Sequence, residues 1–142
     1  MKYQVNSLPQ LSEFIKEFIP YLEKNKIFLL YGEMGVGKTT FIQETLREIG
    51  ILELSGSPTY SLINTYENQK FGELNHLDLY RLKSIDEAYD IGLEELFDNN
   101  SICFIEWPQK IIEMLPKNYI SVYFTLNEDL TRTIEINETK KV

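Results

Sequence analysis

The sequence predicts an α/β fold of three layers, in which a mixed, mostly parallel sheet carries helices on both faces. Apolar or alternating runs typical of strands are interspersed along the chain with segments of helical periodicity, which is the pattern of such folds. Residues 32–39 read GEMGVGKT and match the phosphate-binding pattern G-x-x-x-x-G-K-[ST]. The match follows an apolar run and opens a helical pattern, as a P-loop does in its fold. We therefore predict a single P-loop NTPase domain over residues 1–142.

The composition is that of a compact domain with an acidic surface. Hydrophobic residues make up 43% of the chain and aromatic residues 13%, which is enough for a core. Lysine and arginine number 14 against 22 acidic residues, so the net charge is −8. Such a charge repels phosphate backbones unless a local basic patch overrides it, and the sequence has no such patch. We expect no strong direct nucleic-acid binding by this chain alone.

The sequence favours a cytoplasmic protein without a membrane span. Its first residues, MKYQVN, lack the apolar core of a signal peptide, and no apolar run approaches about 18 residues. The one cysteine, Cys103, lies in an apolar run typical of a buried strand. Neither an internal disulfide nor a cysteine metal site is therefore expected.

The first elements lead to the phosphate loop. Ser7 and Gln10 form a capping box, and apolar residues at helical spacing follow it. Pro20 is expected to kink or end this helix near Ile19. The run 27–31 predicts the strand before the loop, and the helix after it is predicted by Phe41, Ile42, Thr45, Leu46 and Ile49.

Two strands joined by a polar turn are predicted next, at residues 60–66 and 73–80. Because strand side chains alternate between faces, His76, Asp78 and Tyr80 are expected to share one surface. The rest of the chain is predicted to form a short helix capped at Ser84 and interrupted at Gly92, a strand at 102–106, a helix around 111–115, and two closing strands at 119–125 and 131–136.

The phosphate loop predicts a nucleotide site. Its backbone N–H groups and the positive end of the following helix attract an anion. Lys38 is expected to reach the β- and γ-phosphates, and the Thr39 hydroxyl to coordinate magnesium. A glycine turn that only joins two core elements is the alternative. The predicted nucleotide-binding residues of the loop are Gly32, Gly35, Val36, Gly37, Lys38, Thr39 and Thr40.

Hydrolysis also needs an acid near the magnesium ion and a group that positions water. Glu106 ends a buried strand, where ligands collect in α/β sheets, so we expect it to hold magnesium directly or through water. Asp78 is the second candidate, and His76 beside it is more simply interpreted as structural. Thr59 lies in a Gly/Ser/Pro segment where a hydroxyl would contact the γ-phosphate or magnesium, or would only serve turn geometry.

The remaining residues discriminate between classes of P-loop protein. A guanine-specific GTPase needs Asn-Lys-x-Asp after the loop, but the only Asn-Lys pair, at 25–26, precedes it. A small-molecule kinase closes an arginine-bearing lid over the phosphoryl group, and the chain has three arginines and no lid insertion. An ATPase that acts on a partner is favoured. A stand-alone kinase and a non-hydrolysing nucleotide sensor remain alternatives.

Five blocks also occur in an order that resembles a known family. They are GEMGVGKTT at 32–40, SPTYSL at 57–62, HLDLYRL at 76–82, GLEE at 92–95 and EWP at 106–108. Together they resemble the TsaE family of bacterial tRNA threonylcarbamoyladenosine biosynthesis proteins. The resemblance implies an ATPase that uses ATP and Mg²⁺, works with the TsaB and TsaD proteins, and meets tRNA only through that complex.

The resemblance also implies roles for single residues. Thr39 and Glu106 would hold magnesium, Lys38 would bind phosphates, Asp78 would assist hydrolysis, and Thr59 would lie in a switch-like segment. A basic residue near the nucleotide in the family matches Arg132 here. The family often continues EWPE[RK], whereas this chain has Gln109 at the fourth position.

Overall fold

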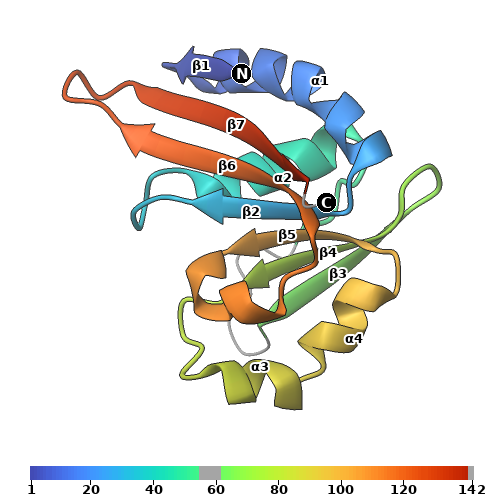
Figure 1. Ribbon diagram of the computed structural model, residues 1–142. Coiled ribbons are helices and arrows are strands. Elements are labelled where there is room, and N and C mark those ends of the chain that lie inside the picture. Colours follow the sequence, from blue (N-terminus) through green and yellow to red (C-terminus); the bar gives the residue numbers. More distant parts are fainter. Residues whose placement is uncertain (55–61, 141–142) are drawn as a thin grey trace.

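The computed structural model describes residues 1–54 and 62–140 and arranges them around one seven-stranded sheet (Figure 1). The strands are β1 (Lys2–Val5), β2 (Ile27–Tyr31), β3 (Ile63–Asn68), β4 (Gly72–Asp78), β5 (Ile102–Glu106), β6 (Asn118–Leu126) and β7 (Arg132–Lys140). The helices are α1 (Leu8–Lys24), α2 (Lys38–Glu48), α3 (Ile85–Asp90), α4 (Leu93–Asp98) and the 3₁₀ helix η1 (Pro108–Met114). Among these described residues, none of the helices is long and apolar enough to cross a membrane.

The sheet is mixed, with its parallel strands in the centre. The strand order is β1-β7-β6-β2-β5-β4-β3. Strands β6, β2, β5 and β4 are parallel neighbours, while β7 and β3 run antiparallel to the strands beside them. Because β1 pairs antiparallel with β7, it points the same way as the central strands. The predicted mixed, mostly parallel sheet is confirmed.

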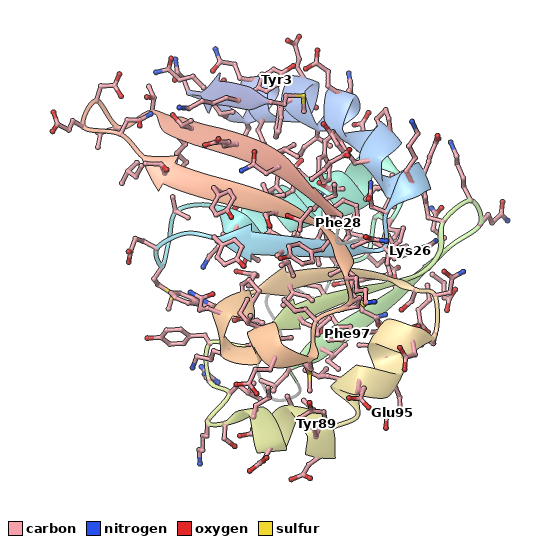
Figure 2. The ribbon with its side chains drawn as sticks, viewed as in Figure 1. Tyr3, Lys26, Phe28, Tyr89, Glu95 and Phe97 are labelled. Carbon is pink, nitrogen blue, oxygen red and sulfur yellow. The ribbon has the colours of Figure 1, made fainter. Side chains whose placement is uncertain are left out.

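Helices cover both faces of this sheet, so the three-layer prediction is also confirmed. On one face, α1 and α2 pack on alternate strand residues such as Phe28 and Leu30. On the other, α3, α4 and η1 pack on the intervening residues, such as Ile27 and Leu29. Figure 2 shows Phe28 on the first side and Phe97 at α4 on the second. This alternation means that β2, β4 and β5 each present every second side chain to α2, the helix that follows the phosphate loop.

Helix α1 is longer than the sequence indicates. Ser7 accepts a hydrogen bond from the Gln10 N–H at 3.4 Å, as a helix cap does, but the Gln10 side chain accepts from the Asn6 N–H at 2.6 Å. The helix continues through Pro20 to Lys24, so of the two expected outcomes, a kink or an end near Ile19, the end is wrong. Fully buried apolar side chains lie on both sides of the proline, at Phe18 and Leu22. Their burial stabilises the turn beyond the proline despite the hydrogen bond that it lacks.

Two further features differ from the expectations. Strand β1 is not predicted from the sequence, and it forms by antiparallel pairing with β7, with Tyr3 packed on Phe14 at 4.6 Å between ring centroids. The helix expected around residues 111–115 is the 3₁₀ helix η1. The hairpin of β3 and β4 is confirmed, but β4 ends at Asp78, so Tyr80 lies in the turn after it.

Candidate functional site

The candidate site lies where the central parallel strands end. In the sheet register, Glu106 of β5 is aligned with Leu30 of β2 on one side and with Asp78 of β4 on the other. Ligands of open α/β folds bind at this carboxyl edge. The phosphate loop follows β2 directly, so the register brings the two acids of the neighbouring strands beside it.

The phosphate loop has a backbone that two of its glycines make possible. A Cβ on Gly32 would stand 2.8 Å from the Val36 side chain and 3.0 Å from the Phe124 carbonyl oxygen, which leaves no room for it. Gly37 is the N-cap of α2 with a φ of 114°, in the left-handed region that favours glycine. The N-cap is a glycine and so has no side chain to bind the N–H groups at this helix end. N–H groups at a helix N-terminus attract an anion.

Lys38 lies within the site rather than in solvent. Its Nζ donates a hydrogen bond to the Gly32 carbonyl oxygen at 2.6 Å and lies 3.8 Å from the centroid of the Trp107 ring. The residue is 4% exposed. Burial lowers the pKa of Lys38, and the negative charges of Glu106 and Asp78 oppose that shift. A buried ammonium in this position favours an anionic ligand, whose charge would balance it.

Glu106 connects the loop to β4 through one carboxylate oxygen. The Thr39 hydroxyl donates to Glu106 Oε2 at 2.7 Å, and His76 Nε2 lies 2.6 Å from the same oxygen. Glu106 is 4% exposed and His76 1% exposed. From the sequence, His76 is more simply interpreted as structural than as catalytic. Its contact with Glu106 depends on the pairing of β4 with β5, which no local pattern reveals.

Asp78 faces the same space as Lys38 and Glu106. Its carboxylate accepts a hydrogen bond from the Tyr80 N–H at 3.1 Å. Burial raises the pKa of Asp78, and the Tyr80 hydrogen bond acts in the opposite direction. A carboxylate that is partly desolvated and lines a cavity is suited to orienting water or a hydrated cation.

These groups surround one small cavity of about 200 Å³. It is lined by Met34, Gly35, Gly37, Lys38, Thr39, Thr40, Asp78, Glu106 and Trp107. The structure thus brings Lys38, Thr39, Asp78 and Glu106 together with Gly35, Gly37 and Thr40 of the predicted phosphate loop, whereas the predicted Gly32, Val36 and Arg132 do not line this cavity. The predicted Thr59 lies outside the described residues.

The donor set of this cavity fits magnesium bound together with a nucleotide. Across residues 1–54 and 62–140, no group of three His, Cys, Asp or Glu side chains could hold a metal ion. Mg²⁺ does not require one, because it is usually held by one or two carboxylates, phosphate oxygens and water. A hydroxyl from Thr39 and carboxylates from Glu106 and Asp78 match that mode.

A second cavity, of about 290 Å³, lies on the other side of the phosphate loop. Val36, Gly37 and Thr40 form one wall, and the segment from Val5 to Leu11 forms another. Arg132 lines it too, with Cδ and Nε 3.8 Å from the point where a Cβ on Gly37 would stand. Arg132 therefore lies against the phosphate loop. The position of the N-terminal residues beside the loop depends on the pairing of β1 with β7, which no local sequence pattern reveals.

Trp107 is the aromatic wall of the phosphate site. It has a φ of 60° and a ψ of 49°, a left-handed conformation that is unusual for a bulky residue. Its ring contacts Tyr80 at 5.1 Å between centroids in addition to the Lys38 ammonium. Residues forced into this region concentrate at functional sites. The backbone turn at the end of β5 thus directs the indole over Lys38.

Comparisons with known proteins identify similar chains. A family profile described as "Threonylcarbamoyl adenosine biosynthesis protein TsaE" matches residues 5–134. The chain is 40% identical over 133 residues to the tRNA threonylcarbamoyladenosine biosynthesis protein TsaE of Rickettsia bellii, covering 93% of this chain and 91% of that protein. It is 37% identical over 141 residues to the protein of the same name from Borreliella burgdorferi, covering 96% and 99%.

The same fold occurs in a solved structure. The crystal structure of YdiB from Bacillus subtilis superposes with a TM-score of 0.76 and covers 99% of this chain and 86% of that one. The sequence identity is 23%, so this similarity concerns the fold.

Proposed function

Because the chain belongs to the TsaE family of threonylcarbamoyl adenosine biosynthesis proteins, we propose that it is the ATP-hydrolysing subunit of the machinery that forms threonylcarbamoyladenosine in tRNA. One observation carries the ATPase part of the proposal. Lys38, Thr39, Asp78 and Glu106 line a single cavity at the N-terminus of α2. These are the groups that phosphoryl transfer to water requires, namely a cation for the phosphates, ligands for magnesium, and a carboxylate for water.

In the proposed reaction each side chain has one task. Lys38 would exchange its present acceptor, the Gly32 carbonyl, for phosphate oxygens, and the N–H groups at the start of α2 would bind the same phosphates. Thr39 and Glu106 would hold Mg²⁺. When bound, the ion neutralises charge on the β- and γ-phosphates. Asp78 would orient the attacking water, because its carboxylate lines the cavity beside Lys38.

The second cavity is the proposed position of the base and ribose. Val36 and Leu8 offer apolar contact to a purine ring, and Asn6 and Ser7 offer polar groups to its edge. Arg132, between this cavity and Gly37, would add positive charge close to the phosphates. In this proposal the base would lie in the second cavity and the phosphates in the cavity lined by Lys38, with Gly37 and Thr40 lining both.

We further propose that TsaB and TsaD are its partners and that tRNA is reached through them, in the cytoplasm. The net charge of −8 supports this division of labour, because an acidic subunit contributes little to holding an RNA backbone. The family to which the chain belongs supports the pathway, and the partners follow from the resemblance of its motifs.

A steady-state ATPase assay tests the proposal with and without TsaB and TsaD. We expect weak turnover by the chain alone, stimulation by both partners, and loss of turnover in Lys38→Ala. Lys24→Ala, which removes an exposed lysine at the end of α1, serves as the control. Turnover that ignores both the partners and Lys38→Ala would contradict the proposal. Transfer of labelled γ-phosphate to a metabolite instead of water would replace it with a kinase.

A further inference from the structure

His76 is the one histidine of the chain, and no role in the proposed reaction has been given to it. We propose that His76 is a positioning residue that donates its Nε2–H to Glu106 and so fixes the carboxylate that holds Thr39 and magnesium. The inference rests on the proposed function, since it concerns the same magnesium site. The inference goes beyond the proposed function because it assigns part of the affinity for the metal to His76, a side chain that does not touch the metal.

The backbone fixes the imidazole with little freedom. His76 and Asp78 lie on the same face of β4, and β4 is paired in parallel with β5, whose last residue is Glu106. His76 is 1% exposed and is flanked by β3 as well, where Asn64 is its register partner. A donor carried by the interior of a paired strand is held more rigidly than one on a loop. The 2.6 Å contact with Glu106 is therefore built into the sheet.

The direction of the hydrogen bond follows from its partners. A carboxylate oxygen accepts, so the hydrogen between His76 and Glu106 must be carried by Nε2. The other ring nitrogen, Nδ1, is buried and has no hydrogen-bond partner in the described part of the chain. Among the described residues, the imidazole thus has one polar contact, the one to Glu106, which is unusual for a buried ring. The hydrogen bond to the Glu106 carboxylate accounts for the burial of His76 at this position.

The hydrogen bond determines which part of the carboxylate is free. Glu106 Oε2 accepts from both the Thr39 hydroxyl and His76 Nε2. This arrangement leaves Oε1 for a cation or for a water molecule bound to it. Without the imidazole donor, the buried carboxylate would lose one of the two bonds that set its orientation. Outer partners of metal-binding carboxylates are typically worth about 10- to 100-fold in metal affinity.

The structure separates this role from that of a general base. His76 does not line the cavity formed by Lys38, Thr39, Asp78 and Glu106. Its Nε2 is occupied by Glu106, and the ring is almost completely buried. A general base must reach the proton that it removes, directly or through one water molecule. The imidazole instead acts through Glu106.

A matched pair of substitutions tests the inference. His76→Gln and His76→Met replace the ring with chains of equal length, but only glutamine keeps an N–H donor at the far end. Manganese, the paramagnetic substitute for magnesium, is titrated against protein and a non-hydrolysable ATP analogue and followed by electron paramagnetic resonance. We expect His76→Met to weaken Mn²⁺ binding by about 10-fold or more and His76→Gln to stay within about threefold of the wild type. Affinity for the analogue in EDTA should be equal in all three proteins.

The outcomes distinguish the inference from the function on which it rests. A wild-type protein that takes up no Mn²⁺ with the analogue contradicts the proposed function and the role of His76 with it. Wild-type binding that survives in His76→Met, or that falls equally in both variants, overturns the inference alone. Should the variants fail to fold, ¹⁵N spectra of the wild type locate the proton on this single imidazole. A proton on Nε2 supports the inference, and one on Nδ1 alone overturns it.

Discussion

Asp78 illustrates a conflict between stability and function within one side chain. Burial raises its pKa in the folded protein above the ordinary value of about 3.9. Because the folded-state pKa is raised, the carboxyl group contributes favourably to the free energy of unfolding at a pH below its ordinary pKa. This contribution is lost as the pH rises through the folded-state pKa. The ionised carboxylate at pH 7 therefore reduces the free energy of unfolding, and its retention there is explained by the proposed role in hydrolysis.

Asp78→Asn should consequently stabilise the protein and inactivate it. We expect the Tm at pH 7 to rise by about 2 °C, a small effect because the side chain is partly hydrated. The amide oxygen can still accept from the Tyr80 N–H. At about pH 3, where the carboxyl group is protonated in both states, the two proteins should unfold together. ATP hydrolysis at pH 7 should fall about 100-fold. A lower Tm at pH 7 would contradict this account.

Trp107 should report the occupancy of the phosphate site. It is the only tryptophan of the chain, and the Lys38 ammonium lies 3.8 Å from its ring centroid. A cation over an indole face interacts directly with its π system. If ATP attracts Lys38 to its phosphates, the environment of the indole changes.

We therefore expect Mg-ATP to change the intrinsic fluorescence of the protein in a saturable titration. Adenosine, which has no phosphates to attract Lys38, is the control and should leave the emission unchanged. The same half-saturation should appear when ATP competes with a fluorescent analogue. An emission spectrum that stays constant at saturating Mg-ATP would show that Lys38 keeps its contact with Trp107.

Among the elements, those defined by local patterns could be predicted from the sequence. The strand before the phosphate loop and the helix after it are as expected, because the apolar run Ile27–Tyr31 and the spacing of Phe41, Ile42 and Leu46 are self-contained signals. Strand β1 could not be predicted. Two of its four residues, Lys2 and Gln4, are exposed, and the segment forms a strand only because β7, more than 120 residues later, pairs with it. The second cavity depends on that pairing.

The candidate site also combines residues that local patterns indicate with contacts that depend on the fold. The motif indicated Lys38 and Thr39, and the end of an apolar strand indicated Glu106, so these positions were available from the sequence. The hydrogen bond from His76 to Glu106 was not, because it depends on the register between β4 and β5. The cation–π contact of Trp107 depends on a left-handed backbone that sequence patterns do not reveal.

Helix α1 shows how tertiary packing overrides a local signal, the proline at position 20. Pro20 is exposed in the interior of the helix and removes one backbone hydrogen bond. An interior proline destabilises a helix by about 3 kcal/mol relative to alanine. Proline also restricts the unfolded chain, which offsets about 1 kcal/mol of that cost. We expect Pro20→Ala to raise the free energy of unfolding by about 1–2 kcal/mol, measured by urea denaturation.

Pro9, in the first turn of the same helix, is the matched control. It is exposed as well, but its missing N–H would have no partner within the helix. Pro9→Ala should therefore give no gain in the free energy of unfolding. Equal effects of the two substitutions would mean that the backbone of α1 is already adapted to Pro20.

At the scale of the whole molecule, the sheet concentrates the reactive groups at one edge while the surface charge remains acidic. The site uses positive charge from Lys38, and Arg132 lies on the other side of the loop. The net charge of the chain is nevertheless −8. A field of this sign admits a nucleotide chelated by magnesium more readily than an RNA backbone. This charge balance supports the proposal that the chain handles ATP while other proteins hold the RNA.

This charge balance predicts how tRNA binding is distributed in the complex. Non-specific RNA affinity arises from lysine and arginine that displace counterions, and proteins which have it bind at about 1–100 μM in physiological salt. We expect the chain alone to form no complex with tRNA in that range when it is followed by fluorescence anisotropy. Binding should appear when TsaB and TsaD are added, and its salt dependence should be set by them. Micromolar binding by the chain alone would instead require a basic surface strong enough to overcome the charge of −8, and would move part of the RNA recognition onto this subunit.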